Sequence, residues 1–117
     1  MSRYLLIIIV LLIIIDTSGL RTTLEIMKTY FDHEKLDVYQ ASIEFVAWAD
    51  GLIESLPKSL AVTNQLDRAS SSISLNIAEG NGKFTEADRC KFFDIARGSA
   101  LECAACLDVL VAKNRID

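Results

Sequence analysis

Residues 85–112, TEADRCKFFDIARGSALECAACLDVLVA, form the longest helical pattern of the chain and decide its fold class. Thr85, followed three positions later by Asp88, is a variant of the capping box and predicts the start of the helix. At 1.5 Å per residue the helix would be roughly 42 Å long. Its apolar and small residues recur at steps of three and four in two neighbouring rows: Phe92, Ala96, Ser99, Cys103, Cys106 and Leu110, and then Phe93, Ile95, Ala100, Leu107 and Val111.

A second helix is predicted upstream, from about His33 to Ser55. Asp32 is its candidate N-cap, and Leu56-Pro57 ends it because the residue before a proline disfavours the helical region. Its apolar residues also form two rows: Leu36, Tyr39, Ile43, Val46 and Ile53, and beside them Val38, Phe45, Ala49 and Leu52.

The helix between these two is predicted from about Ser59 to Glu79, with Gly80 after it as a left-handed C′ residue. Three long helices with short connections predict antiparallel neighbours, so the fold class is all-α, an up-and-down antiparallel helical bundle. The apolar faces are wider than three helices cover, and a fourth helix or another subunit is expected to pack on them. The buried row of this middle helix is Val62, Leu66, Ala69, Ile73 and Ile77.

The beginning of the chain has a different composition. Leu5–Ile15 is an unbroken run of eleven aliphatic residues, which as a helix would span roughly 17 Å, short of the ~30 Å hydrocarbon core of a membrane. Three interpretations stay open: an extension upstream of a true start at Met27, a signal-like or membrane-associating segment, and a structural part of the domain. We therefore divide the chain into an apolar extension, residues 1–26, and a bundle domain, residues 27–117.

Composition limits the function further. The chain has 117 residues, enough for one domain with a single modest core. Its formal net charge of −4 argues against strong non-specific binding to nucleic acid, because such binding depends on Lys and Arg neutralising phosphates. The cysteines, Cys90, Cys103 and Cys106, are odd in number and lack the spacing of a disulfide framework, so a reducing compartment such as the cytoplasm is expected.

No catalytic, cofactor or metal site is predicted. The one histidine, His33, has no serine or cysteine partner in its local sequence, and no glycine-rich phosphate loop follows a strand. Cys103 and Cys106 share a helical face, but a structural zinc site needs four ligands. We interpret both cysteines as small apolar core residues, and we expect the protein not to be an enzyme.

Four blocks of sequence carry a family resemblance: LDVYQ at 36–40, QLDRAS at 65–70, NIAEGNG at 76–82 and IARGSALE at 95–102. With these blocks in order, the chain from about Phe31 to Asp117 resembles the four-helix-bundle proteins encoded in intervening sequences of bacterial 23S rRNA genes. The motif residues that the resemblance singles out are Gln65, Arg68, Asn76, Glu79, Gly80, Arg97, Gly98, Ser99 and Glu102.

The resemblance implies a four-helix bundle that assembles into a homo-oligomer, a ring of five, and it leaves the molecular function open. Related bundle proteins accompany the reverse transcriptases of retroelements and bind RNA through a basic surface, which implies RNA or an RNA-associated protein as a partner. The chain differs from the family pattern in its apolar extension and in lacking the fourth helix. A fragment, a frameshift or a premature stop would explain the second difference.

The remaining candidates for functional or structural roles are charged residues. Lys83, Arg89 and Lys91 form a small basic cluster, the best candidate for phosphate contacts, although acidic residues between them weaken its field. Small residues between Arg97 and Glu102 would let another helix approach closely. These two are also expected to form ion pairs that set the register with the preceding helix, through Asp67, Arg68 or Glu79.

The leading hypothesis is therefore a non-enzymatic, cytoplasmic, homo-oligomeric bundle protein that acts as a scaffold or as an RNA-associated interaction module. The alternative is a membrane-associated or exported helical protein that uses residues 5–15. A decayed reading frame without a folded product is a third hypothesis.

Overall fold

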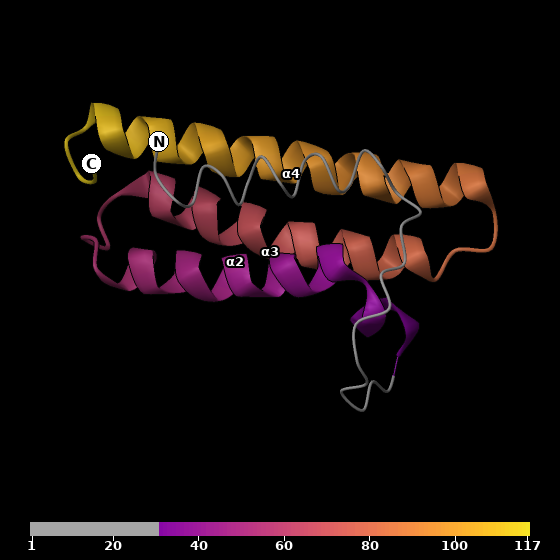
Figure 1. The fold of residues 1–117 in the computed structure, drawn as a ribbon. Coiled ribbons are helices and arrows are strands. Elements are labelled where there is room, and N and C mark those ends of the chain that lie inside the picture. Colours follow the sequence, from indigo (N-terminus) through magenta and orange to yellow (C-terminus); the bar gives the residue numbers. More distant parts are fainter. Residues whose placement is uncertain (1–30) are drawn as a thin grey trace.

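The computed structural model describes residues 31–117, so the apolar extension of residues 1–26 lies outside the described residues. A short 3-10 helix, η1 (Asp32–Lys35), precedes three α-helices: α2 (Asp37–Glu54), α3 (Ala61–Asn81) and α4 (Glu86–Ala112). Helix α3 lies between α2 and α4, and successive helices run in opposite directions (Figure 1). The described part contains no β-strand. The prediction of an all-α, antiparallel helical arrangement is confirmed.

The core forms where α3 meets its two neighbours. The row predicted for α3 is buried along its whole length, and α2 and α4 add Phe45, Ala49 and Leu110. Three residues assigned to apolar rows are instead exposed, because they lie at the outer edges of faces too wide for the available neighbours: Ile43 at 45%, Ile95 at 43% and Val111 at 47%.

Two serine pairs fix the position of α3 against its neighbours. Ser74 Oγ donates to Ser42 Oγ of α2 at 2.9 Å, and Ser99 Oγ of α4 donates to Ser72 Oγ at 2.8 Å. Ser72 and Ser74 are two positions apart, so they project from different sides of α3. Within the described chain, no Cα of α2 lies within 8 Å of a Cα of α4. The backbones of the two outer helices therefore approach α3 more closely than they approach one another.

The first helix begins later than predicted. Leu36, with φ −78° and ψ 127°, is the extended residue before α2, and Asp32 belongs to η1. The Oδ2 atom of Asp32 accepts a hydrogen bond from Asn81 Nδ2 at 3.0 Å. The prediction of Asp32 as an N-cap is wrong because a tertiary contact engages its carboxylate. The helix ends at Glu54, shortly before Pro57, as predicted.

Gly80 does not end the middle helix. Helix α3 continues to Asn81, and the C-cap is Gly82, whose φ of −82° is right-handed. A Cβ atom built on Gly80 would lie 2.9 Å from Phe92 Cβ and 3.1 Å from Phe93 Cε1. The prediction of a left-handed C′ residue is wrong, and the reason for a glycine here is the close approach of α4.

The start of α4 agrees with the sequence. Thr85 Oγ1 accepts a hydrogen bond from the backbone N–H of Asp88 at 3.1 Å and donates to Asp88 Oδ2 at 2.8 Å. Thr85 thereby satisfies one of the backbone N–H groups that a helix start leaves without a partner.

Candidate functional site

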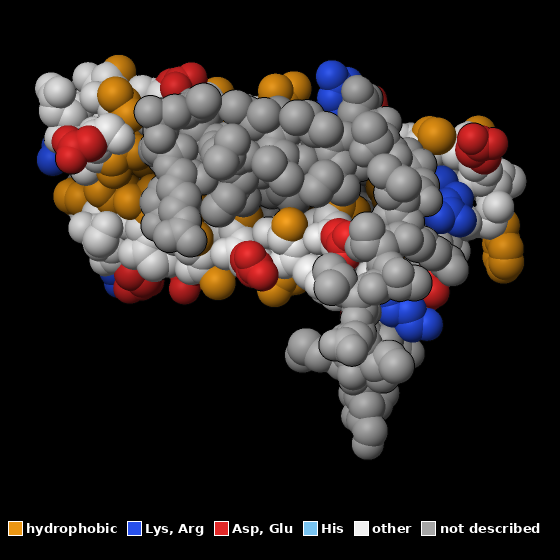
Figure 2. Space-filling view, viewed as in Figure 1, with side chains coloured by type: hydrophobic (Ala, Val, Ile, Leu, Met, Phe, Trp, Pro, Cys, Tyr) orange, Lys and Arg blue, Asp and Glu red, His pale blue; other side chains and the backbone are white. Residues whose placement is uncertain are grey.

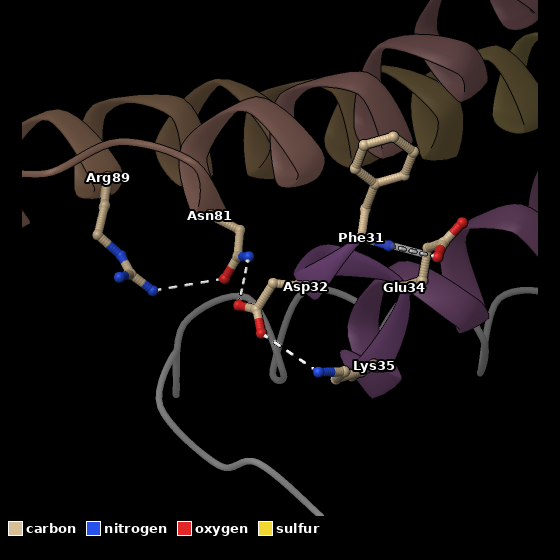
Figure 3. A network of polar contacts seen from close by, with 6 residues as sticks. All are labelled: Phe31, Asp32, Glu34, Lys35, Asn81 and Arg89. Atoms are coloured by element: carbon tan, nitrogen blue, oxygen red, sulfur yellow. Dashed lines mark hydrogen bonds and ion pairs between the residues drawn. The ribbon is translucent and has the colours of Figure 1, made fainter. Parts of the chain in front are cut away.

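A chain of polar contacts joins η1 to the end of α3 and the start of α4 (Figure 3). Arg89 Nη2 donates to Asn81 Oδ1 at 3.5 Å, and Asn81 Nδ2 donates to Asp32 Oδ2 at 3.0 Å. Lys35 Nζ lies 3.9 Å from the other oxygen of Asp32. An exposed ion pair such as that of Lys35 and Asp32 contributes at most about 1 kcal/mol. The contacts therefore serve mainly to place η1 against the turn between α3 and α4.

The three predicted phosphate contacts lie at this same end of the bundle. Arg89 belongs to the polar chain just described. Lys83 Nζ lies 3.6 Å from Glu79 Oε1 and 4.8 Å from the centroid of the Phe92 ring, a cation–π contact. Lys91 is exposed. On the face seen in Figure 2, acidic side chains lie among the basic ones of the described residues, which limits the local positive field.

The structure adds one residue that the sequence analysis missed. Phe84, in the turn before α4, has a fully exposed side chain. The sequence feature that could have identified Phe84 as exposed is its position between Gly82 and the N-cap Thr85, outside the apolar rows of both helices. The aromatic side chain beside Lys83 gives this turn an exposed apolar surface that its basic residues alone would not provide.

Three of the motif residues set the contact between α3 and α4. Gly80 gives Phe92 room, and Ser99 donates to Ser72. Asn76 Nδ2 donates to the backbone oxygen of Ser72 at 2.8 Å and to its Oγ at 3.0 Å, so Asn76 orients the serine that Ser99 contacts. These residues belong to the packing of the chain itself.

The other motif residues point outward. The ion pairs predicted from Arg97 and Glu102 to α3 do not form among the described residues, because both side chains lie on the exposed side of α4. Of the expected partners, Asp67 and Arg68 are exposed, and Glu79 pairs with Lys83 of its own segment. A Cβ atom on Gly98 would have no atom within 4 Å, so no helix of the described chain packs there. The exposed members of the set are Gln65, Arg68, Glu79, Arg97, Gly98 and Glu102.

An apolar stripe, defined here as Ile95, Gly98, Glu102, Ala105 and Val109, follows the same outer side of α4. Its members recur at steps of three and four, the spacing of a seam against another helix. All five are exposed, as is the neighbouring Leu101. The stripe therefore has one acidic residue, Glu102, among apolar and small residues.

The cysteines divide into one exposed and two buried thiols. Burial raises the pKa of the Cys103 thiol from 9.0 to about 12, with smaller contributions from the charges of Cys106 and Glu102. Burial also raises the pKa of Cys106, with Glu102 adding to the effect. Cys90 is exposed. Among residues 31–117, no group of three His, Cys, Asp or Glu side chains is arranged to hold a metal ion.

The described helices also bear on the membrane alternative. Between residues 31 and 117, none of them combines the length and the apolar character needed to span a bilayer. The run at residues 5–15, on which that alternative rests, lies outside the described residues.

These features define an antiparallel helical bundle in which a set of motif residues faces outward along the α3–α4 hairpin. The family model for the 23S rRNA-intervening sequence protein matches residues 34–117. The chain belongs to this family. No match was found among curated proteins or among solved structures.

Proposed function

We propose that the protein is a non-enzymatic scaffold that assembles with copies of itself through the outer face of the α3–α4 hairpin. The observation that carries the proposal is the outward placement of Arg97, Gly98 and Glu102 beside exposed apolar side chains on α4. The core of the chain does not require these residues on that side. Contact with another molecule gives them a role.

The stripe favours a helix as the contacting element. Gly98 and Ala105 let a neighbouring backbone approach closely, and Ile95 and Val109 supply apolar area on either side. Glu102 stands in the middle of the stripe. A two-fold pairing of α4 with itself centred there would bring two Glu102 carboxylates together.

A head-to-tail contact, in which α4 of one copy meets a different surface of the next, avoids that repulsion. Contacts of this kind form a closed ring when the rotation between copies closes. A ring of five, which the family resemblance implies, is the assembly we propose. An exposed cation such as Arg68 on α3 is the type of residue that would receive Glu102 of a neighbouring copy.

The test replaces an alanine by arginine on each of two exposed helix faces. Ala105 lies in the stripe on α4, and Ala47 lies on the exposed side of α2. In sedimentation velocity, Ala105→Arg should shift the protein toward the single chain, and Ala47→Arg should leave the assembly intact. Equal behaviour of the two variants would count against the stripe as the interface.

RNA association is a second candidate, supported by the exposed ring of Phe84 beside Lys83. Stacking of an unpaired base on an aromatic ring tolerates many sequences, and a nearby cation meets the phosphate. Repetition of a weak site around a ring would raise the overall affinity. Fluorescence anisotropy with single-stranded RNA at low salt tests this: Phe84→Ala should weaken binding, and an absence of binding by the intact protein argues against the role.

The same proposal places the protein in the cytoplasm, where its three cysteines would stay reduced, and assigns it no cofactor. Cell fractionation distinguishes this from the membrane-associated or exported alternative. Recovery of the intact chain in the membrane fraction would favour an anchoring role for residues 5–15.

A further inference from the structure

Helices α2 and α4 each carry an apolar row beside the side that packs on α3. Successive members of the row on α2 are four, three and four residues apart, and successive members of the row on α4 are seven, four and three residues apart. Each row lies about a quarter of a turn from the serine through which its helix contacts α3. Most of the side chains that line these rows are half-buried against the same core, and the rows are Ala41, Phe45, Trp48 and Leu52 on α2 and Phe93, Ala100, Ala104 and Leu107 on α4.

The two rows border one corner of the bundle. Helices α2 and α4 lie on two sides of α3, and no Cα atom of one comes within 8 Å of a Cα atom of the other; Figure 1 shows their backbones apart. Because both rows belong to a single core cluster, they face a common space. In an antiparallel bundle of four helices, this corner is the place of the fourth.

We propose that the apolar run Leu5–Ile15 of this chain covers that corner. The run lies outside the described residues, and its composition, its length and its place in the sequence support this assignment. It contains no charged residue, and the two rows contain none either. Exposure of such a run to water is unfavourable and promotes aggregation, whereas burial between two apolar rows removes it from water.

The lengths agree. Eleven residues in a helix span roughly 17 Å, and the row from Ala41 to Leu52 advances by eleven residues, the same distance along α2. Residues 16–30 connect the run to Phe31, where the described chain begins. Fifteen residues reach up to about 50 Å when extended, which is ample to join the end of the run to the start of α2.

The chain direction agrees as well. Helices α2 and α4 are parallel to one another because each is antiparallel to α3 (Figure 1). A segment that leads into the start of α2 from the corner runs antiparallel to α2, and therefore antiparallel to α4. This is the arrangement of neighbours in an up-and-down bundle. The corner is also separate from the outer stripe of α4, so this proposal and self-assembly stand independently.

Trp48 provides the probe, because it is the only tryptophan of the chain and lies in the α2 row. The experiment compares the full chain with Ile9→Asp, which places a charge in the middle of the run, and with Ser18→Asp, which adds the same charge outside it. With Ile9→Asp, Trp48 emission should shift to longer wavelength and its acrylamide quenching constant should rise toward that of the urea-unfolded chain. Ser18→Asp should match the unmodified protein.

Equal quenching in Ile9→Asp and Ser18→Asp, with helical content retained by circular dichroism, would overturn the proposal. So would protection of Trp48 that disappears on dilution of the intact chain, because a second copy would then be the occupant. If Ile9→Asp fails to fold, a double-mutant cycle replaces it. Ile9→Ala combined with Leu52→Ala should be non-additive and with the exposed Ile43→Ala additive, and additivity in both would reject the proposal.

Discussion

The close approach of α3 and α4 at Gly80 makes a quantitative prediction. In Gly80→Ala the new Cβ would lie 2.9 Å from Phe92 Cβ, nearer than such atoms pack. Phe92 Cβ is fixed to the backbone, so α4 itself must move, and a rotamer change cannot relieve the contact. Overpacking of this kind costs typically about 1–3 kcal/mol.

A gain in helix propensity opposes this cost. Alanine is better than glycine by up to about 1 kcal/mol inside a helix, and less at Gly80 because α3 ends one residue later. We therefore expect Gly80→Ala to lower the free energy of unfolding by about 1–2 kcal/mol. Gly51→Ala is the matched control, since a Cβ there would have no atom within 4 Å, and it should raise stability by about 0.5–1 kcal/mol.

The assay is urea unfolding followed by far-ultraviolet circular dichroism, with all variants at the same protein concentration because assembly also contributes to stability. Phe92→Ala should not rescue Gly80→Ala, since the substitution keeps the Cβ atom that makes the contact. A Gly80→Ala protein as stable as the Gly51→Ala protein would refute the reasoning.

Four further predictions concern individual side chains. Thr85→Ala removes the N-cap of α4 and should cost about 1 kcal/mol in urea unfolding. Ser42→Ala leaves the buried hydroxyl of Ser74 without its acceptor and should cost about 1–3 kcal/mol, whereas the double substitution to alanine should recover part of the loss; full additivity would contradict this. Burial raises the pKa of Cys103 from 9.0 to about 12, so above pH 9 the folded state keeps a proton that the unfolded state releases. The contribution of Cys103 to stability should therefore be constant below pH 9 and fall by up to about 1.4 kcal/mol per pH unit between pH 9 and 12. Cys103→Ala should reduce the slope of stability against pH in that range. At neutral pH a thiol reagent should modify Cys90 rapidly and Cys103 slowly, and equal rates would argue against the described burial.

Most of the fold could be predicted from the local periodicity of apolar residues in the sequence. The apolar row of α3 was identified residue by residue, because a helix buried on one continuous face leaves a regular pattern at steps of three and four. The start of α4 was predictable for a similar reason, since the bond between Thr85 and Asp88 involves only neighbouring residues. The direction of each helix followed from the short connections.

Contacts between residues far apart in the sequence could not be predicted from this periodicity. Asp32 has the side chain of an N-cap, but Asn81, far along the chain, takes its carboxylate. Gly80 occurs where a helix often ends, yet the reason for it is the proximity of Phe92. A sequence pattern gives the width of an apolar face but not the number of neighbours that cover it.

The candidate site was predictable in part. The basic cluster was found from charge alone, but the partners of Lys83 and Arg89 depend on how the turn folds against η1. The outward direction of Arg97 and Glu102 was missed because the expected ion pairs assumed that α3 and α4 meet along that side. Phe84 was missed because an exposed aromatic residue in a turn leaves no periodic signal.

Self-assembly is the central claim, and native mass spectrometry of the intact chain across a dilution series tests it most directly. We predict a closed assembly of defined stoichiometry, five copies of the 13.0 kDa chain, that persists on dilution and that Ala105→Arg dissociates. A folded protein with the mass of a single 13.0 kDa chain at every concentration would contradict the claim.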